Sequence, residues 1–427
     1  MRMYRTGHGD CFLLAFPGVS ESKPVYVLID CGYKPGSPRF INTTVTDITK
    51  NIREATGGHI DVAVITHEHQ DHVNGITAAN FAGITIGETW LAWTEDPNDP
   101  VAGRLRTVFK DKLLGLLAAR NRLAAGGDAE RVERIDDLLT FELGGDSEAF
   151  DAREAAALLG ASGGDPAQSN NKRSMKIFKD LAQNGVKYIL PHQEILAVPG
   201  AKDVRVFALG PPRDLDQLED LDPRANEEFH GMALASAENY LAAAAASPVG
   251  HGQSPFARRY ALVQEGALGD SEFGAYFTRH YGGGGIATLG APQEGDQVPD
   301  NADWRRIDKE WLYSAEHLAL NMSNYTNNAS LVLAFEIGVG GKVLLFAADA
   351  QRGNWASWAR KEWTDGDRQL TTRDLLGRTV LYKAGHHGSH NATLNGLAGD
   401  ENANIAWMAQ GDHGREFTAM ITAVRAW

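Results

Sequence analysis

The chain has 427 residues, of which 43% are hydrophobic and 22% are charged, and its formal net charge at pH 7 is −14. This composition is ordinary for a globular protein, and no apolar run reaches the roughly 18 residues of a membrane-spanning helix. The acidic balance disfavours non-specific binding to nucleic acid, because such binding depends on Lys and Arg neutralising phosphates.

The N-terminus and the two cysteines predict a compartment. Residues 1–5 lead straight into the first predicted strand and leave no room for a secretory signal. Cys11 and Cys31 are each expected in a strand of an opening hairpin, where a reduced pair of small core residues is favoured over a disulfide. We therefore expect a cytoplasmic protein that does not associate with membranes.

The first sixty residues predict two strands and a helix. Segments 7–16 and 24–31 are expected to form the strands, and Asp30 closes the second one. Apolar residues recur at helical spacing over 45–55, which predicts a helix packed against the sheet. A glycine pair ends this helix, and the next strand begins at Ile60.

The strand that begins at Ile60 ends in a cluster of side chains that bind metals. His67, His69, Asp71 and His72 follow one another within six residues. Imidazole and carboxylate groups suit zinc and similar divalent ions. Because residues two apart point the same way in an extended chain, we expect His67 and His69 to bind one ion together. Asp71 and His72 follow where the strand ends, so they are expected to turn toward a second ion.

Two long segments follow the motif. After a short helix predicted over 74–81 and a strand over 85–93, residues 97–184 carry three apolar stripes at helical spacing. They predict a helical insertion that covers one side of the site or forms a dimer contact. Residues 213–320 form a second insertion, rich in Ala and Gly. Its run Gly282–Gly285 lacks the preceding strand and the Lys-Ser/Thr ending of a phosphate loop.

The remaining segments predict a second set of strands. Short apolar runs bounded by turn residues are typical of buried strands. Such runs lie at 186–190, 204–209, 331–337, 343–348 and 380–384. The third and fourth are expected to pair as a hairpin, Asp349 follows the fourth, and His386 and His387 follow the fifth. The chain is expected to end in a helix over 417–427.

The run from His67 to His72 resembles the His-x-His-x-Asp-His signature of the metallo-β-lactamase fold superfamily. Other stretches match that superfamily in chain order: Gly7–Leu14 with Val27–Gly32, Asn328–Leu333 with Val343–Asp349, and Leu381–Ser389. The opening hairpin and the late His-His-Gly-Ser look like the branch that includes competence-type DNA-uptake nuclease domains and phosphorylcholine esterases.

This resemblance implies an α+β fold, a four-layer αββα sandwich with helical insertions. Because the matching stretches run from residue 7 to residue 389, we expect one enlarged domain over 1–427, with insertions at about 97–184 and 213–320. The resemblance also implies that Asp30 is a structural residue that supports the metal-binding loop.

The resemblance further implies two divalent metal ions, with zinc favoured and manganese as the alternative. The ligands carried over by position are His67 and His69 for the first metal, Asp71 and His72 for the second, and Asp349 as the bridge between them. Ala348 stands where the superfamily usually has Gly before that Asp, which is a mild departure.

Either His386 or His387 is implied as the last ligand of the second metal, since neighbours in an extended segment face opposite ways. We favour His387, because a Gly follows it as in the related His-Gly ending. His386 would then meet the substrate as a hydrogen-bond donor or proton source. Lys383 and Ser389 are candidates to contact a phosphate, although Lys383 could instead face solvent. Asp71 is also a candidate to orient the attacking water.

The third ligand of the first metal is not evident, because no His stands at the expected place before Ser330. The branch that this chain resembles has Asn in that region, which here offers Asn327 and Asn328. The other candidates, each more often a surface or core residue than a ligand, are His192, His230, His251, His280 and His317. This gap predicts a first metal that binds weakly or only together with substrate.

The implied function is that of a metal-dependent hydrolase that uses a metal-activated hydroxide. The branch favours phosphodiester bonds, in a nuclease or in a small-molecule phosphodiesterase, with a phosphodiester or another anionic ester as substrate. Net charge does not favour nucleic acid as the partner. Two alternatives remain open: a thioester or lactone hydrolase of the same fold, and a non-catalytic scaffold that presents its insertions to a protein partner or a second copy.

Overall fold

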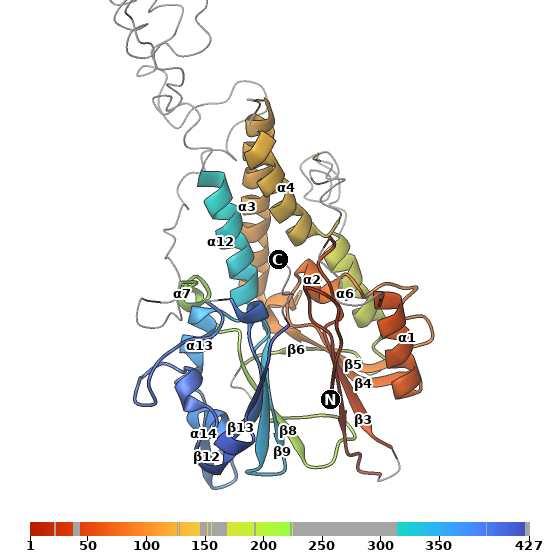
Figure 1. Ribbon diagram of the computed structural model, residues 1–427, viewed down its shortest axis with the longest axis vertical. Coiled ribbons are helices and arrows are strands. Elements are labelled where there is room, and N and C mark those ends of the chain that lie inside the picture. Colours follow the sequence, from red (N-terminus) through yellow and green to blue (C-terminus); the bar gives the residue numbers. More distant parts are fainter. Residues whose placement is uncertain are drawn as a thin grey trace, which may run out of the picture.

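The protein is a sandwich of two β-sheets between layers of helices, as the ribbon in Figure 1 shows. The computed structural model describes residues 1–20, 23–36, 43–125, 127, 129–145, 152, 155, 169–191, 194–222, 224, 314–389 and 391–422. The predicted α+β class and its αββα layering are confirmed by this arrangement.

The first sheet is built from the first half of the chain. Its six strands lie in chain order: β1 (Arg2–Met3), β2 (Phe12–Phe16), β3 (Val25–Ile29), β4 (His59–Val64), β5 (Thr85–Ala92) and β6 (Val186–Ile189). β2 and β3 pair as an antiparallel hairpin, whereas β3 to β6 run parallel. The carboxyl ends of these parallel strands therefore meet at one edge of the sheet.

The second sheet is built mainly from the last third of the chain. Its strands follow the order β14 (Thr418–Met420), β13 (Thr379–Lys383), β10 (Lys342–Phe346), β9 (Val332–Ile337), β8 (Val204–Gly210) and β7 (Leu196–Ala197). The predicted hairpin is confirmed as the antiparallel pair β9–β10. β10 and β13 run parallel, so their carboxyl ends also lie together.

Alternation along the strands separates the inner core from the outer layers. Phe12, Leu14 and Phe16 of β2 face the second sheet, where they join Phe335 and Phe346. The intervening Leu13 joins the outer cluster instead. Since side chains in a strand alternate between faces, each buried strand contributes apolar residues to two layers.

Helices cover the outer face of each sheet. On the first sheet lie α1 (Val45–Thr56) and α6 (Asn170–Leu181). α1 begins with a capping box between Thr44 and Asp47, which satisfies free backbone donors of its first turn. On the second sheet lie α13 (Arg352–Trp358) and α14 (Thr372–Gly377), and the small hairpin of β11 (Glu362–Asp365) and β12 (Arg368–Thr371) adjoins them.

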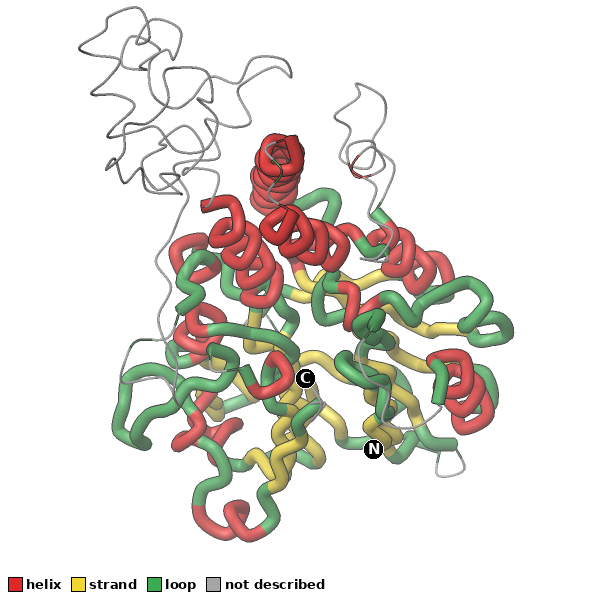
Figure 2. Tube along the Cα trace, turned by 45° about the horizontal axis from the view of Figure 1, so that its top comes forward, coloured by secondary structure: helices red, strands yellow, loops and turns green. Residues whose placement is uncertain are grey.

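Three further helices stand over one end of the sandwich. α3 (Pro100–Ala125) and α4 (Ala129–Leu143) lie in the predicted helical insertion, and α12 (Ser314–Asn328) packs against both. Leu116, Leu139 and Met322 belong to the apolar cluster that joins them. When the top of the molecule is turned forward, Figure 2 shows these helices above the ends of the strands.

The second insertion is described only at its edges. The short helix α7 (Leu215–Leu218) lies at its start, and α12 begins inside the predicted boundary and continues past residue 320. The predicted Gly run at 282–285 lies outside the described residues. The extent of a single domain and the two insertion boundaries stay predictions.

Two local predictions are wrong. Residues 74–81 form turns, and the helix instead is α2 (Gln70–Val73), which begins four residues earlier and contains Asp71 and His72. The predicted helix at 417–427 begins as the edge strand β14 (Thr418–Met420), because these residues pair with β13. Local periodicity did not reveal this pairing, which depends on a strand almost forty residues away.

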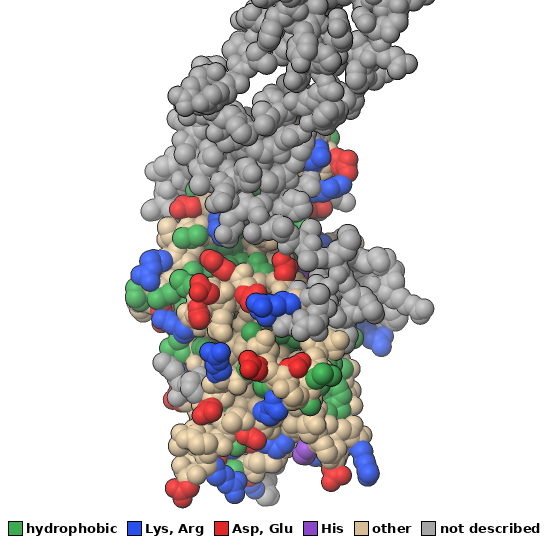
Figure 3. Space-filling model, turned by 90° about the vertical axis from the view of Figure 1, so that its left-hand side faces the viewer, with side chains coloured by type: hydrophobic (Ala, Val, Ile, Leu, Met, Phe, Trp, Pro, Cys, Tyr) green, Lys and Arg blue, Asp and Glu red, His purple; other side chains and the backbone are tan. Residues whose placement is uncertain are grey.

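The surface, the cysteines and the helices each add one observation. Acidic and basic side chains are interspersed on the face shown in Figure 3, which carries α13 and α14. Cys11 and Cys31 are buried, free thiols. Among the helices in the described residues, none combines the length and the apolar character that crossing a membrane requires.

Candidate metal centre

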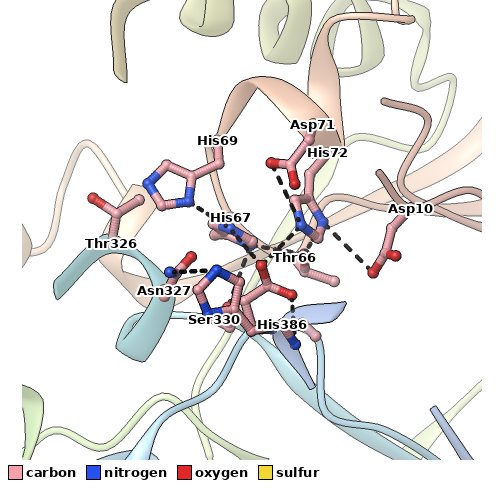
Figure 4. Close-up of polar contacts among 12 residues, drawn as sticks. Asp10, Thr66, His67, His69, Asp71, His72, Thr326, Asn327, Ser330 and His386 are labelled. Atoms are coloured by element: carbon pink, nitrogen blue, oxygen red, sulfur yellow. Dashed lines mark hydrogen bonds and ion pairs between the residues drawn. The ribbon is translucent and has the colours of Figure 1, made fainter. Parts of the chain in front are cut away.

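Four chain segments meet at the edge where the parallel strands of both sheets end. The loop after β4 supplies His67 and His69, and α2 supplies Asp71 and His72. Asp349 follows β10, and His386 and His387 follow β13. Figure 4 shows His67, His69, Asp71, His72 and His386 converging on one centre. Residues 282 positions apart in sequence, Asp349 and His67, come within 3.9 Å.

The second predicted metal site is a compact group of four side chains. Asp71, His72, Asp349 and His387 each offer one ligand atom, and these atoms all lie within 4.8 Å of one another. His72 Nε2 is 3.2 Å from Asp349 Oδ2, and His387 Nε2 is 2.8 Å from Asp71 Oδ2. Two carboxylates and two imidazoles are a donor set that divalent transition metals favour.

The first predicted metal site is a pair of ring nitrogens. His67 Nε2 and His69 Nδ1 face each other at 3.1 Å. Two nitrogens bound to one tetrahedral zinc lie roughly 3.3 Å apart, so this spacing suits a shared cation. His67 Nε2 also lies 3.9 Å from Asp349 Oδ2, so Asp349 is the member of the group of four that contacts the pair.

The two predicted metal sites contain four histidines: His67, His69, His72 and His387. In each of them, the ring nitrogen that does not face the cluster contacts another protein group. His67 Nδ1 lies 3.1 Å from Thr66 Oγ1, and His69 Nε2 lies 3.0 Å from Glu142 Oε1. His72 Nδ1 contacts Asp30 Oδ2 at 2.9 Å, and His387 Nδ1 donates to the Thr422 carbonyl at 2.7 Å. A metal-binding imidazole usually donates its other N–H in this way, which fixes ring and tautomer.

Asp30 supports the loop as predicted. Its Oδ1 accepts the backbone N–H of Thr66 at 2.8 Å, and its Oδ2 accepts the Thr66 hydroxyl at 2.7 Å. The same Oδ2 meets His72 Nδ1. One buried carboxylate therefore fixes both the start of the motif and its last histidine.

Glu142 is a site residue that sequence reasoning missed. It is 5% exposed, and it lies on the same stripe of α4 as the buried Ile135 and Leu139. A carboxylate on an apolar stripe is the available signal, since Glu is almost never buried without a partner. The other missed residues are Asp10, Thr66, Ser330 and Thr422, which bind the ligands or their supports.

In the group of four, neighbouring side chains counteract the effect of burial on the pKa of each carboxylate. Burial raises the pKa of Asp71, but His72 and the hydrogen bond from His387 outweigh burial and hold that pKa well below its usual range. Burial likewise acts against Asp349, whose pKa is held far below its usual range by His72 and Lys383. Both side chains are therefore carboxylates at neutral pH, the form that binds cations.

His386 and His387 diverge, although the segment is not extended as predicted. Both have left-handed backbone conformations, with φ of 40° and 53°, inside the turn His386–Gly388. His387 turns toward Asp71, whereas His386 Nε2 lies 3.4 Å from Asn327 Nδ2. Left-handed non-Gly residues cost roughly 1–2 kcal/mol each, and such strain concentrates at functional sites.

His386 is a neutral hydrogen-bond donor. Because an amide nitrogen donates, Asn327 makes His386 Nε2 the acceptor and leaves the proton on Nδ1. That Nδ1 is buried and has no partner among the described residues. Burial lowers the pKa of His386 to about 4, so the ring is uncharged at pH 7. Of the two predicted roles, hydrogen-bond donation fits this state and delivery of a proton from an imidazolium does not.

Asn327 and Asn328 differ in what their side chains bind. Asn328 Nδ2 donates to the Gln217 and Leu218 carbonyls, and its Oδ1 accepts from the backbone N–H groups of Gln351 and Asn354. Asn327 Oδ1 is buried without a partner among the described residues. Asn327 is thus the Asn with a free ligand atom beside His67 and His69.

The remaining histidine candidates cannot be placed at the site. His192, His230, His251 and His280 lie outside the described residues, and the structure does not describe the side chain of His317. The third ligand of the first metal therefore stays open.

Lys383 lies beneath the group of four and does not face solvent. Its side chain is 1% exposed, its ammonium forms an ion pair with Asp10, and Asp349 Oδ1 is 3.6 Å away. Asp10 in turn accepts the Thr422 hydroxyl at 2.7 Å. The solvent-facing alternative for Lys383 is wrong. Its buried pairing places the ammonium where it supports Asp349, and a direct contact with a phosphate stays a prediction.

The residues present fit a divalent metal centre. Asp71 Oδ1, Asn327 Oδ1 and His386 Nδ1 are buried and lack hydrogen-bond partners among the described residues. Unpaired buried polar atoms cost free energy, so their gathering beside two carboxylates and four oriented imidazoles needs a reason. Ligation of cations and binding of a polar substrate would supply that reason.

A comparison with family models places this geometry in context. Residues 10–151 match the metallo-beta-lactamase superfamily, a segment that contains His67, His69, Asp71 and His72 and covers about a third of the chain. The comparison with curated proteins gave no match, and neither did the comparison with solved structures. The family match supports the superfamily, and together with the His and Asp group it supports a metal-dependent hydrolase.

Proposed function

We propose that this protein is a metal-dependent hydrolase of small phosphodiesters. The observation that carries the proposal is the group of four: Asp71 and His72 from the first half of the chain meet Asp349 and His387 from the second within 4.8 Å. Such convergence of buried charges is costly unless the groups act on a cation or substrate. The presence of all four side chains together argues against a non-catalytic scaffold.

Bound cations would supply Lewis-acid chemistry to the proposed reaction. When bound, two divalent cations lower the pKa of a water molecule and neutralise the anionic oxygens of an ester. His67 and His69 would hold the first cation, and Asp71, His72 and His387 the second, with Asp349 between them. Zinc suits these nitrogen-rich donors, and manganese is the alternative.

The protein's own side chains divide the remaining work. Asp71 Oδ1 is buried and has no hydrogen-bond partner among the described residues, so it could accept a hydrogen bond from the attacking water and orient it. His386 Nδ1–H can donate to an oxygen that becomes more negative in the transition state. Lys383 offsets the charge of Asp10 and Asp349 from behind.

A phosphodiester substrate agrees with the sequence features of the branch and with the donors at the site. The net charge of −14 and the mixed charges in Figure 3 supply no broad basic surface on that face for a polynucleotide. Small diesters are therefore favoured over nucleic acid. The free, buried cysteines agree with a reducing compartment, which supports a cytoplasmic location.

A thioester or lactone is the second candidate substrate. A cavity that is largely apolar adjoins His67, and it would suit the acyl group of such an ester. The same centre serves both chemistries, because a tetrahedral oxyanion and a phosphorane both need neutralised oxygens.

The test compares two substrates on one preparation. Protein purified without chelator is supplied with Zn²⁺ or Mn²⁺, and nitrophenol release from bis(4-nitrophenyl) phosphate is compared with thiol release from an acyl thioester. We expect diester turnover to exceed thioester turnover. The reverse order would favour the second candidate, and no turnover of either substrate would sink the hydrolase proposal.

Two variants tie the activity to the centre. His69→Ala and Asp349→Ala are expected to reduce turnover below detection while the circular dichroism spectrum stays that of the folded protein. The matched control is His59→Ala. His59 is a half-exposed histidine at the start of β4, the strand whose other end leads into the cluster. Retained turnover in either site variant would remove the assigned roles.

A further inference from the structure

A cavity of about 330 Å³ lies beside the first metal site, where β4 and β5 end beneath the inserted helices. Ile65, Thr66 and His67 line it from the motif loop, and Glu142 and Thr326 line it from α4 and α12. His67 belongs to the proposed first site, and Glu142 orients His69. The cavity and the metal centre therefore share a wall.

The remaining walls are largely apolar. Leu105, Phe109 and Leu113 come from α3, Leu143 from α4, and Tyr325 from α12. The rings of Phe109 and Tyr325 stack with their centroids 6.3 Å apart. The Tyr325 hydroxyl is buried and has no hydrogen-bond partner among the described residues. A ligand that fills this space gains mainly from removing apolar surface from water.

Two of the charged residues at the cavity, Lys172 and Arg106, are engaged with other protein groups. The Lys172 ammonium lies 2.7 Å from the Glu68 carboxylate. Arg106 donates to the carbonyls of Thr94 and Asp96. These contacts leave the apolar wall as the part of the cavity that is best suited to a ligand, while the anionic part of the substrate would remain at the metal centre.

We propose that the substrate carries an apolar alkyl or aryl group, about the size of a hexyl chain or one ring, which occupies this cavity while the ester is hydrolysed. The inference rests on the proposed hydrolase function and narrows its substrate class. The volume lies near the lower end of small-molecule pockets, which favours a compact group over a lipid tail. The helical insertion thereby selects the substrate of a centre built by the sandwich.

The test measures binding and turnover separately. Methyl-, butyl-, hexyl- and dodecylphosphonate are titrated calorimetrically into the metal-loaded protein, and each is used as a competitor of bis(4-nitrophenyl) phosphate hydrolysis. We expect affinity to rise by about fourfold or less per methylene up to hexyl and then to level off. Equal affinity along the series, or tighter binding by a short oligonucleotide than by hexylphosphonate, would overturn the inference.

Two cavity variants and one control locate the effect. Leu105→Trp should fill the cavity and remove most of the gain from methyl to hexyl, with methylphosphonate affinity unchanged. Phe109→Ala should move the plateau to longer chains. Thr107→Trp adds the same bulk on the exposed side of α3 and should leave the series as in the parent protein. Loss of the chain-length effect in the control, an undiminished gain from methyl to hexyl in Leu105→Trp, or an unmoved plateau in Phe109→Ala would contradict the assignment.

The failure of this inference can be distinguished from failure of the proposed function. If the diester is hydrolysed but the phosphonate series is flat, the hydrolase proposal stands and the cavity assignment falls. If no ester is hydrolysed in the presence of Zn²⁺ or Mn²⁺, the proposed function falls first.

Discussion

At the scale of residues, the centre depends on what lies behind each imidazole. His69 and His72 each contact a buried carboxylate through the nitrogen that faces away from the cluster. A carboxylate at that position makes the imidazole a better ligand and prevents the ring from turning. Glu142 and Asp30 should therefore affect metal affinity although neither is placed as a ligand.

Replacing Glu142 tests this role. Glu142→Ala should weaken the first metal by about 10- to 100-fold, because His69 loses the group that fixes its ring. Glu142→Gln keeps an acceptor and should recover part of the loss. Metal content after dialysis and calorimetric titration with Zn²⁺ measure the effect. Glu133→Ala, at an exposed position of the same helix, is the matched control. Unchanged affinity for both metals in Glu142→Ala would contradict the role.

His386 gives a second prediction at this scale. As a neutral Nδ1–H donor, it should contribute about 10²- to 10³-fold to kcat, comparable with one donor of an oxyanion hole. His386→Ala should lose this factor with its metal content unchanged. His386→Asn places an amide N–H near the same position, tolerates the left-handed backbone, and should recover most of the activity.

The pH profile separates donation from proton delivery by His386. Since burial lowers the pKa of His386 to about 4, its ring does not titrate between pH 6 and 9. The kcat profiles of the parent protein and of His386→Asn should therefore run parallel in this range. If kcat of the parent protein fell with rising pH near neutrality and kcat of His386→Asn did not, His386 would act as an acid.

At the scale of elements, the sequence predicted those strands and helices whose formation depends on residues close together in the chain. β2 buries both of its faces, so its successive residues enter two different apolar clusters. α1 buries one face, which produces its apolar stripe at helical spacing. The ligand motif was predicted because its residues lie within six positions of one another. α2 was misplaced because a four-residue helix has too few turns to show periodicity. The strand β14 depends on pairing with β13, which no local pattern encodes.

The missed parts of the site share a physical reason. Glu142, Asp10 and Thr422 act through side chains that are close only after folding, and each comes from a different element. Asp349, by contrast, was predicted because it follows a strand and stands where the superfamily that the chain resembles has its bridging Asp. Position at a strand end is visible in a sequence, whereas a contact between α4 and the motif loop is not.

Lys361, between α13 and β11, gives a prediction about stability. It is 9% exposed, and burial lowers its pKa to about 8. Between pH 8 and about 10.5 the unfolded chain keeps a proton that the folded chain has lost, so stability rises with pH across this window. Lys361→Met should remove that rise and stabilise the protein at pH 7 by up to about 3 kcal/mol.

Urea unfolding at pH 7 and pH 9.5 measures this effect of Lys361. Lys342→Met is the control, because Lys342 is half-exposed and its ion pair with Glu416 lies on the surface. Such pairs contribute about 0–1 kcal/mol, so this variant should change little. Equal pH dependence of the parent protein and Lys361→Met would contradict the prediction.

At the scale of the whole molecule, the centre joins two sheets that come from different parts of the chain. Asp71 and His72 follow the first sheet, whereas Asp349 and His387 follow strands of the second. A cation that binds all four would connect the halves only when both are folded. Metal binding should therefore appear as stability of the whole protein.

Thermal unfolding with and without metal tests this coupling. Free Zn²⁺ at about 100 times its dissociation constant should add about 2.7 kcal/mol, which corresponds to a rise in Tm on the order of 5 °C. Chelator should reverse the rise. His387→Ala should lose most of it, whereas His59→Ala should keep it. An identical Tm with zinc and with chelator would contradict coupling through the centre.

The position of these side chains in the chain has a consequence for biosynthesis. A ribosome makes His387 long after the motif His67–His72, and Thr422, which holds the His387 ring, is made later still. A nascent or prematurely released polypeptide would carry the early histidine motif without its late partners. The proposed hydrolytic activity would thus be withheld until the segment that carries Asp349, His387 and Thr422 has been made, and products released before that point would be inert toward the cell's esters.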